Sequence, residues 1–303
     1  MERPPTSNPR VNAGEALSIY ESARGQPRKR ILVEPLLWTR LHLEILSCTF
    51  SHCSPAPPAM MHLPSTEDAR QDARLRRDFE RFFFGYRNLR VAKEGVLRGH
   101  LCDEPSPLSW CCDLYLHLGG NRSIILPCTY YCLGDYIPVA AHIDRSRILT
   151  QRQKKLGLPM GLRYSLPAFN VSELKLKSVT PTDPLHDPYL VALLIALGQL
   201  QWRALGRQKP QQAAGVTPKL MFSTEDRKNI YILSANISSS LINMFHYPAI
   251  KPAAPDPLVV RISSVAYEPI ETLRGRLLAL LLLLLSTISI KDVDKLENLI
   301  VYT

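Results

Sequence analysis

Glu173 and Lys175, an acid and a base separated by one residue, are a candidate catalytic pair. They lie in Asn170–Val179, where apolar and charged residues alternate, and alternation predicts a β-strand. Residues two apart on a strand face the same side, so the carboxylate would stand beside the ammonium group. Such a pair could bind a divalent cation and orient a water molecule for phosphodiester cleavage. The same pattern is also typical of an ordinary exposed strand face.

A helix and further strands must position these residues. We predict a helix over Asp187–Gly206, because Asp187 is a favourable N-cap and Pro188 suits the first helical position. Extended segments follow at Lys219–Ser223 and Asn229–Ala235. The pattern is typical of an α/β or α+β fold, with a central mixed sheet and helices packed on it.

All of these elements are predicted to belong to one domain over 31–303, which a disordered, proline-containing tail over 1–30 precedes. A proline-rich linker is predicted at about 51–64. The other predicted elements are a helix or strand over 31–48, a helix over 65–86, a β-rich region over 91–143 with a hairpin at Gly119-Gly120-Asn121, a short basic helix or loop over 145–158, a helix over 238–245, a strand over 259–267 and a C-terminal helix at about 271–285.

The order of the elements around Glu173 resembles the PD-(D/E)xK nuclease-like fold, in which a strand with an acid–x–Lys pattern precedes a helix. The resemblance implies a second metal-binding acid on an earlier strand. Asp113, at the start of a predicted strand, is the best match, and Asp144 is the other choice. It also implies Mg²⁺ as the ion that Asp113 and Glu173 would hold. The chain departs from the pattern, because Asp113 lies sixty residues before Glu173 and no Pro-Asp precedes it.

Cysteines offer a second set of candidate ligands. Five of them lie close together in the sequence, with His100 and His117 nearby: Cys102, Cys111, Cys112, Cys128 and Cys132. Zinc sites commonly use paired C-x₂-C knuckles, and this region has none. We therefore expect buried free thiols. The odd total of seven and an N-terminus without an apolar signal region predict a reducing compartment, the cytoplasm or the nucleus.

The net charge of +10 is concentrated in one region, 144–177, which has eight basic residues against two acids. The basic residues are Arg145, Arg147, Arg152, Lys154, Lys155, Arg163, Lys175 and Lys177. Such an excess attracts phosphate, so nucleic acid is a candidate partner of this region. The alternative is a solvated basic loop.

The stretch Leu277–Ile290 is apolar over fourteen residues, with six consecutive leucines from Leu280. A bilayer-spanning helix needs about 20 apolar residues. We therefore predict a final core helix rather than a membrane segment. A membrane-associated C-terminus is the alternative, and it requires these leucines to be exposed.

Four stretches resemble a group of filamentous-fungal proteins with no assigned activity: 170–177, 186–199, 231–237 and 245–248. The similarity covers roughly 166–285. It implies a shared fold and an intracellular eukaryotic setting, and it transfers no catalytic residue.

Sequence motifs of the common enzyme classes are absent, including phosphate-binding glycine loops and the G-x-S-x-G and H-E-x-x-H patterns. We therefore expect a non-catalytic globular protein that acts through interactions. The alternatives are a divergent metal-dependent nuclease-like enzyme that uses Asp113, Glu173 and Lys175 with Mg²⁺, and a protein anchored to a membrane at its C-terminus.

Overall fold

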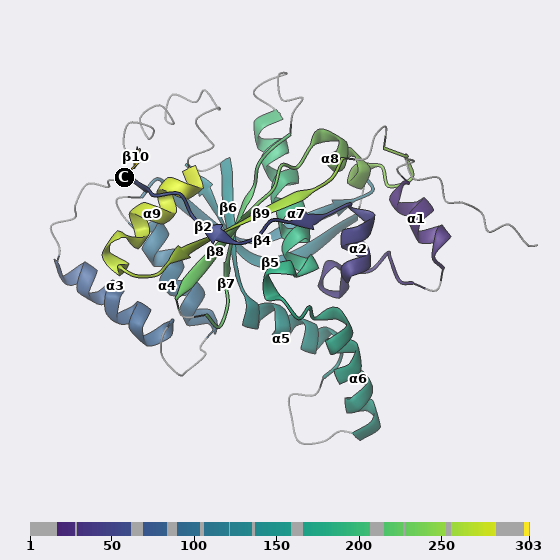
Figure 1. Ribbon diagram of the computed structural model, residues 1–303, viewed down its shortest axis with the longest axis horizontal. Helices are drawn as coiled ribbons and strands as arrows, with labels where there is room; N and C mark the ends of the chain where they lie inside the picture. Colours follow the sequence, from purple (N-terminus) through teal and green to yellow (C-terminus); the bar gives the residue numbers. More distant parts are fainter. Residues whose placement is uncertain are drawn as a thin grey trace, which may run out of the picture.

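The computed structural model shows an α/β fold in which helices cover both faces of a mixed eight-stranded sheet (Figure 1). This arrangement confirms the predicted fold class. The structure describes residues 17–27, 29–61, 69–83, 90–103, 106–120, 122–134, 137–158, 166–206, 215–226, 228–252, 256–282 and 300–302.

The helices in these residues are α1 (Ile19–Gly25), α2 (Arg40–Ile45), α3 (Ala69–Phe82), α4 (Arg90–Cys102), α5 (Arg145–Lys155), α6 (Leu166–Val179), α7 (Pro188–Gly206), α8 (Ser239–His246) and α9 (Ile270–Leu282). The strands are β1 (Thr49–Phe50), β2 (Ser54–Pro55), β3 (Ala59–Met61), β4 (Leu108–Leu118), β5 (Arg122–Leu133), β6 (Ile137–Asp144), β7 (Lys219–Ser223), β8 (Asn229–Ser234), β9 (Val259–Ala266) and β10 (Ile300–Tyr302).

The sheet has the strand order β1-β9-β8-β7-β6-β5-β4, and β2 also pairs with β9. Strands β4, β5 and β6 form an antiparallel meander. The chain then passes through α5, α6 and α7 and returns as β7, which runs parallel to β6. Strands β8 and β9 continue antiparallel. The carboxyl ends of β6 and β7 therefore lie side by side.

The hairpin predicted at Gly119-Gly120-Asn121 joins β4 and β5, with Leu118 opposite Arg122. Gly119 has φ +62°, a left-handed conformation that glycine adopts at little cost. The hairpin prediction is confirmed.

Two apolar layers enclose the sheet, with α7, α8 and α2 on one face and α3, α4 and α9 on the other (Figure 1). Helix α7 is buried on all sides from Tyr189 to Leu197, because it is apolar all round and packs on β4 and β6. Its start is as predicted: the Asp187 carboxylate accepts a hydrogen bond from the Tyr189 N–H at 2.9 Å.

The N-terminal part of the chain is more ordered than the sequence suggested. Residues 1–16 of the predicted tail lie outside the described residues. Ile19–Gly25 forms α1, with a capping box between Ser18 and Glu21 and with Ile19 buried. The proline-rich segment predicted as a linker contributes β2, which pairs with β9, and β3, which pairs with β10.

The prediction of a β-rich region over 91–143 is wrong for its first part, which forms helix α4. Lys93, Leu97, His100 and Leu101 are buried, and this spacing of four, three and one residues places them on one helical face. Gly95 and Gly99 lower the helix propensity of the segment, which is why its sequence does not stand out as helical.

Candidate functional site

The predicted strand with Glu173 and Lys175 is wrong, because residues 166–179 form helix α6. The half-buried residues Phe169, Ser172, Leu176 and Val179 follow helical spacing, whereas Val171, counted as apolar strand face, is half exposed. Helix α6 projects away from the sheet (Figure 1).

The helix changes the relation between the two predicted catalytic residues. Residues two apart on a helix are separated by about 200° around the helix axis, so Glu173 and Lys175 do not share a face. Glu173 instead lies 3.9 Å from Lys177, one helical turn further on. The geometric basis for a joint role of Glu173 and Lys175 is therefore lost.

Asp113, the other predicted metal ligand, lies inside β4 rather than at its start. The register with β5 shifts between Cys112 and Leu114, and Asp113 at this bulge has φ +60°. Aspartate tolerates this left-handed conformation better than most residues. Within the described part of the chain, no group of three or more histidine, cysteine, aspartate or glutamate side chains is arranged to hold a metal ion.

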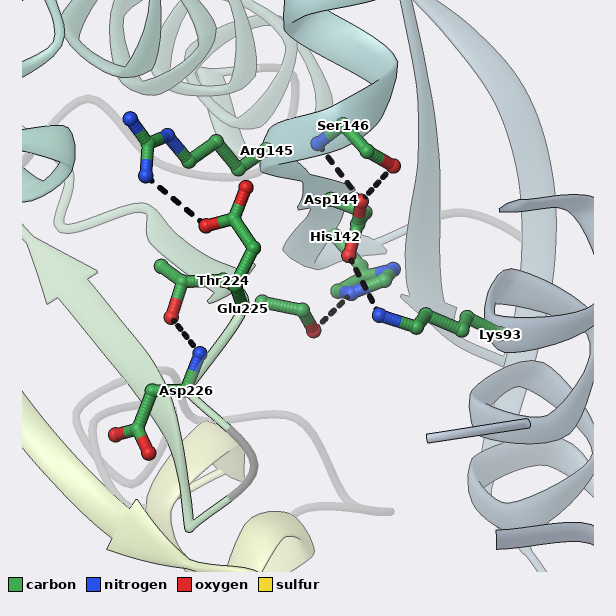
Figure 2. Close-up of polar contacts among 9 residues, drawn as sticks. Lys93, His142, Asp144, Arg145, Ser146, Thr224, Glu225 and Asp226 are labelled. Carbon is green, nitrogen blue, oxygen red and sulfur yellow. Dashed lines mark hydrogen bonds and ion pairs between the residues drawn. The ribbon is translucent and has the colours of Figure 1, made fainter. Parts of the chain in front are cut away.

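The structure brings a different set of polar side chains together, at the carboxyl ends of β6 and β7 (Figure 2). His142 and Asp144 are two apart on β6 and face α4, on which Lys93 points back toward them. The Lys93 ammonium group lies 3.7 Å from the Asp144 carboxylate. His142 shares a hydrogen bond of 2.9 Å with the Ser223 hydroxyl at the end of β7. We call Lys93, His142, Asp144 and Ser223 the polar cluster.

Asp144 also begins helix α5. Its carboxylate accepts hydrogen bonds from the Ser146 N–H, at 2.8 Å, and from the Ser146 hydroxyl. One turn into α5, Arg147 donates to Glu94 of α4 at 2.5 Å. The strand end, the start of α5 and the first half of α4 are thus joined by two cation–carboxylate contacts.

Burial dominates the electrostatics of the polar cluster. His142 has no exposed surface and Asp144 has 2%. Burial, the largest cause, lowers the pKa of His142 to about 4, and the neighbouring cations Arg147 and Lys93 act in the same direction while Glu94 opposes them. His142 is therefore neutral at pH 7. Three atoms at this place find no hydrogen-bond partner among the described residues: His142 Nδ1, Asp144 Oδ2 and Glu94 Oε1.

The polar cluster cannot touch a substrate in this structure, since its histidine, aspartate and serine are covered by protein. Its chemistry is internal ion pairing between a sheet and a helix. Asp144 is one of the two candidate second acids, whereas Lys93, Glu94, His142 and Ser223 are not predicted from the sequence. The available signal is the pair His142-x-Asp144 directly before a helix that Asp144 caps.

Most basic residues of the region 144–177 form ion pairs with acids of the chain. Arg152 and Asp187 form a bidentate pair at 2.7 Å. The other pairs are Arg145 with Glu225, Arg147 with Glu94, Lys155 with Glu34 and Lys177 with Glu173. Arg163 lies outside the described residues. Lys154 and Lys175 are exposed.

All seven cysteines are free thiols. Cys128 and Cys132 are buried, and burial raises the pKa of each thiol to about 12. The expectation of free thiols is thus confirmed, but the expectation of burial is wrong for Cys111 and Cys112, which are exposed on β4.

The C-terminal leucines pack in the core. Leu277, Leu278, Leu281 and Leu282 are buried on α9, and residues 283–290 of the apolar stretch lie outside the described residues. The membrane alternative required exposure, so it fails for Leu277–Leu282. In the part of the chain that the structure describes, no helix has the length and apolarity needed to cross a bilayer.

Comparison with known proteins adds no assignment: no protein-family model matches the sequence, and no curated protein matches it.

Proposed function

We propose that the protein is a non-catalytic binding protein that acts through interactions with other macromolecules. The observation that carries this proposal is the occupation of the sheet end by the chain's own cations. Proteins with α/β sheets bind ligands outside the carboxyl ends of their parallel strands. Here Lys93 stands beside Asp144 and Arg147 beside Glu94. The carboxylates that could face a metal ion therefore face an ammonium and a guanidinium group.

The metal-dependent nuclease-like enzyme is the second candidate. Because residues 166–179 are helical, the strand that precedes core helix α7 is β6, and β7, which follows α7, runs parallel to it. The two polar residues of β6 at acid–x–Lys spacing are His142 and Asp144, and the earlier strand β5 carries Pro127-Cys128 rather than Pro-Asp. Strand β6 therefore has no lysine beside its carboxylate, and β5 has no acid. The incomplete pattern supports the non-catalytic proposal.

Calorimetry with Mn²⁺ tests this proposal. We expect no stoichiometric binding to the wild-type protein, because the buried carboxylates already have cations beside them. The measurement is repeated on Glu173→Ala and Asp113→Asn, with Glu44→Ala, at an exposed glutamate of helix α2, as a matched control. Binding that Glu173→Ala or Asp113→Asn abolishes, and that Glu44→Ala leaves unchanged, would overturn the proposal in favour of a metal-dependent enzyme.

Two further aspects belong to the proposal. Free thiols on the surface, Cys53, Cys111 and Cys112, support a reducing compartment, the cytoplasm or the nucleus. Nucleic acid remains a candidate partner through Lys154 and Lys175, although most of the basic region is paired with acids.

A further inference from the structure

An open pocket of about 460 Å³ lies between helix α4 and the first residues of strand β4. Gly95, Arg98 and Gly99 line it from α4, and Leu108, Ser109 and Trp110 line it from β4. Gly95 leaves open space, because a Cβ atom added there would meet nothing within 4 Å. Two of the four α4 residues that line the pocket, Gly95 and Gly99, are glycines without a side chain.

Arg98 provides the positive charge of this pocket. Its guanidinium group lies over the Trp110 ring, with Cζ 4.0 Å from the ring centroid. This stacking holds the planar fork in place and leaves its N–H groups at the ring edge for other partners. Among the described residues Arg98 forms no ion pair, unlike most arginines of the basic region. Trp110 is 42% exposed, so apolar surface is available next to the charge.

Strand β4 adds an extended edge beside the pocket. In the described residues it is the last strand of the sheet. At its far end Gln199 of α7 bonds both the N–H and the C=O of His117, at 2.9 and 3.0 Å, so the amide takes the place of a further strand there. The bulge at Asp113 interrupts the edge in the middle. The regular part next to the pocket is Leu108–Cys112, in which Trp110, Cys111 and Cys112 are exposed.

We propose that Leu108–Cys112 and the pocket beside it bind an extended segment of a partner protein, whose carboxylate side chain pairs with Arg98. A strand added to a sheet edge gains affinity from main-chain hydrogen bonds and specificity from side-chain pockets. This inference rests on the proposed function and names the chemistry of the partner.

Charge and shape favour a single carboxylate in the pocket. One guanidinium fork matches one carboxylate in a bidentate contact. The pocket also contains Asp103, which would repel a doubly charged phosphate more strongly than a singly charged carboxylate. The net charge of +10 favours the approach of acidic segments in general.

The test uses two capped six-residue peptides of alternating threonine and valine, one with a central glutamate and one with glutamine in its place. Binding to the ¹⁵N-labelled full chain is followed by the indole N–H resonance of Trp110, which Trp110→Phe assigns. We expect the glutamate peptide to shift this resonance and to bind about tenfold more tightly than the glutamine peptide, as a charge-assisted hydrogen bond implies.

Three variants show where the peptide binds. Arg98→Gln should abolish the preference for glutamate, Arg98→Lys should retain part of it, and Gly95→Leu should weaken both peptides by filling the pocket. Arg122→Gln, an exposed arginine at the other end of the same hairpin, is the matched control and should bind as the wild type does. Far-ultraviolet circular dichroism of each variant verifies that it is folded.

The proposal is overturned if neither peptide shifts the Trp110 resonance, if both bind equally, or if Arg98→Gln keeps the preference. It is also overturned if a single-stranded oligonucleotide or inorganic phosphate shifts the resonance through Arg98 while the glutamate peptide does not. The Mn²⁺ calorimetry distinguishes this inference from the proposed function. If the protein binds neither the peptides nor Mn²⁺, this inference is lost and the proposed function stands.

Discussion

Arg152 is a charged side chain with no exposed surface, held by three hydrogen bonds. Two go to the Asp187 carboxylate, and the third goes from Nε to the Leu36 carbonyl at 2.8 Å. Asp187 in turn caps α7. Arg152 thus connects α5 and the segment before α2 to the start of helix α7. Its main role is to hold these three segments together.

Removal of one partner should therefore be costly. Arg152→Met leaves the Asp187 carboxylate buried without its cation, and we expect it to lower the free energy of unfolding by about 3–5 kcal/mol. Chemical denaturation measures this loss. Arg40→Met, which removes an exposed pair with Glu44 on α2, should change stability little. Equal effects of the two substitutions would contradict the buried geometry.

His142 makes stability depend on pH. Its pKa in the folded protein is about 4, below the usual value of 6.5, because burial disfavours the imidazolium. Between pH 6.5 and 4 the unfolded chain binds a proton that the folded protein does not, so stability falls as the pH falls. This group alone contributes about 1.4 kcal/mol per pH unit over much of that window.

Urea unfolding at pH 7, 6 and 5 measures this dependence. His142→Gln cannot titrate, so we expect a slope of stability against pH that is shallower by about one proton. His186→Gln, at an exposed histidine, serves as the control. A slope unchanged by His142→Gln would show that the histidine is not buried as a neutral group.

At the scale of elements, Gln199 covers the outer edge of β4 at His117, where the described residues provide no further strand. The amide satisfies a donor and an acceptor that a neighbouring strand would otherwise satisfy. Gln199→Leu leaves both half-buried backbone groups without these partners, and we expect a loss of about 1–3 kcal/mol in unfolding free energy. Faster hydrogen exchange at the His117 amide should accompany it. Gln153→Leu on α5, at a half-buried glutamine, should alter neither quantity.

Helix α4 carries a glycine that its own stability does not require. Gly95 lies in the interior of the helix, and the space that an added Cβ atom would occupy is free. We expect Gly95→Ala to raise the free energy of unfolding by about 0.5–1 kcal/mol. Gly275→Ala on α9 is the contrasting variant: its Cβ would lie 2.6 Å from the Met61 carbonyl oxygen, so it should destabilise. Thermal unfolding of both distinguishes free space from close packing.

At the scale of the molecule, one sheet couples two apolar layers. Leu277 of α9 and Leu193 of α7 lie in different layers, and both are fully buried. We expect Leu277→Ala and Leu193→Ala each to cost about 2–5 kcal/mol and to shift a single unfolding transition. Leu280→Ala, at a half-buried position on the same helix, should cost less. Two separate transitions in either variant would show that the layers unfold independently.

Elements whose signals are local could be predicted from the amino-acid sequence. The buried helix with its cap at Asp187, the hairpin at Gly119, and strands β7 and β8 were predicted, because caps, turns and runs of apolar residues act within a few residues of each other. The fold class follows from their order.

Long-range packing determines that α4 and α6 are helices and where the polar groups lie. Both helices have mixed local preferences, and their identity depends on which face packs against the rest of the protein. The contact between Lys93 and Asp144, the pairing of Arg152 with Asp187 and the closure of β4 by Gln199 join residues 51, 35 and 82 positions apart. No local spacing encodes such contacts, because they form only when the sheet brings distant segments together.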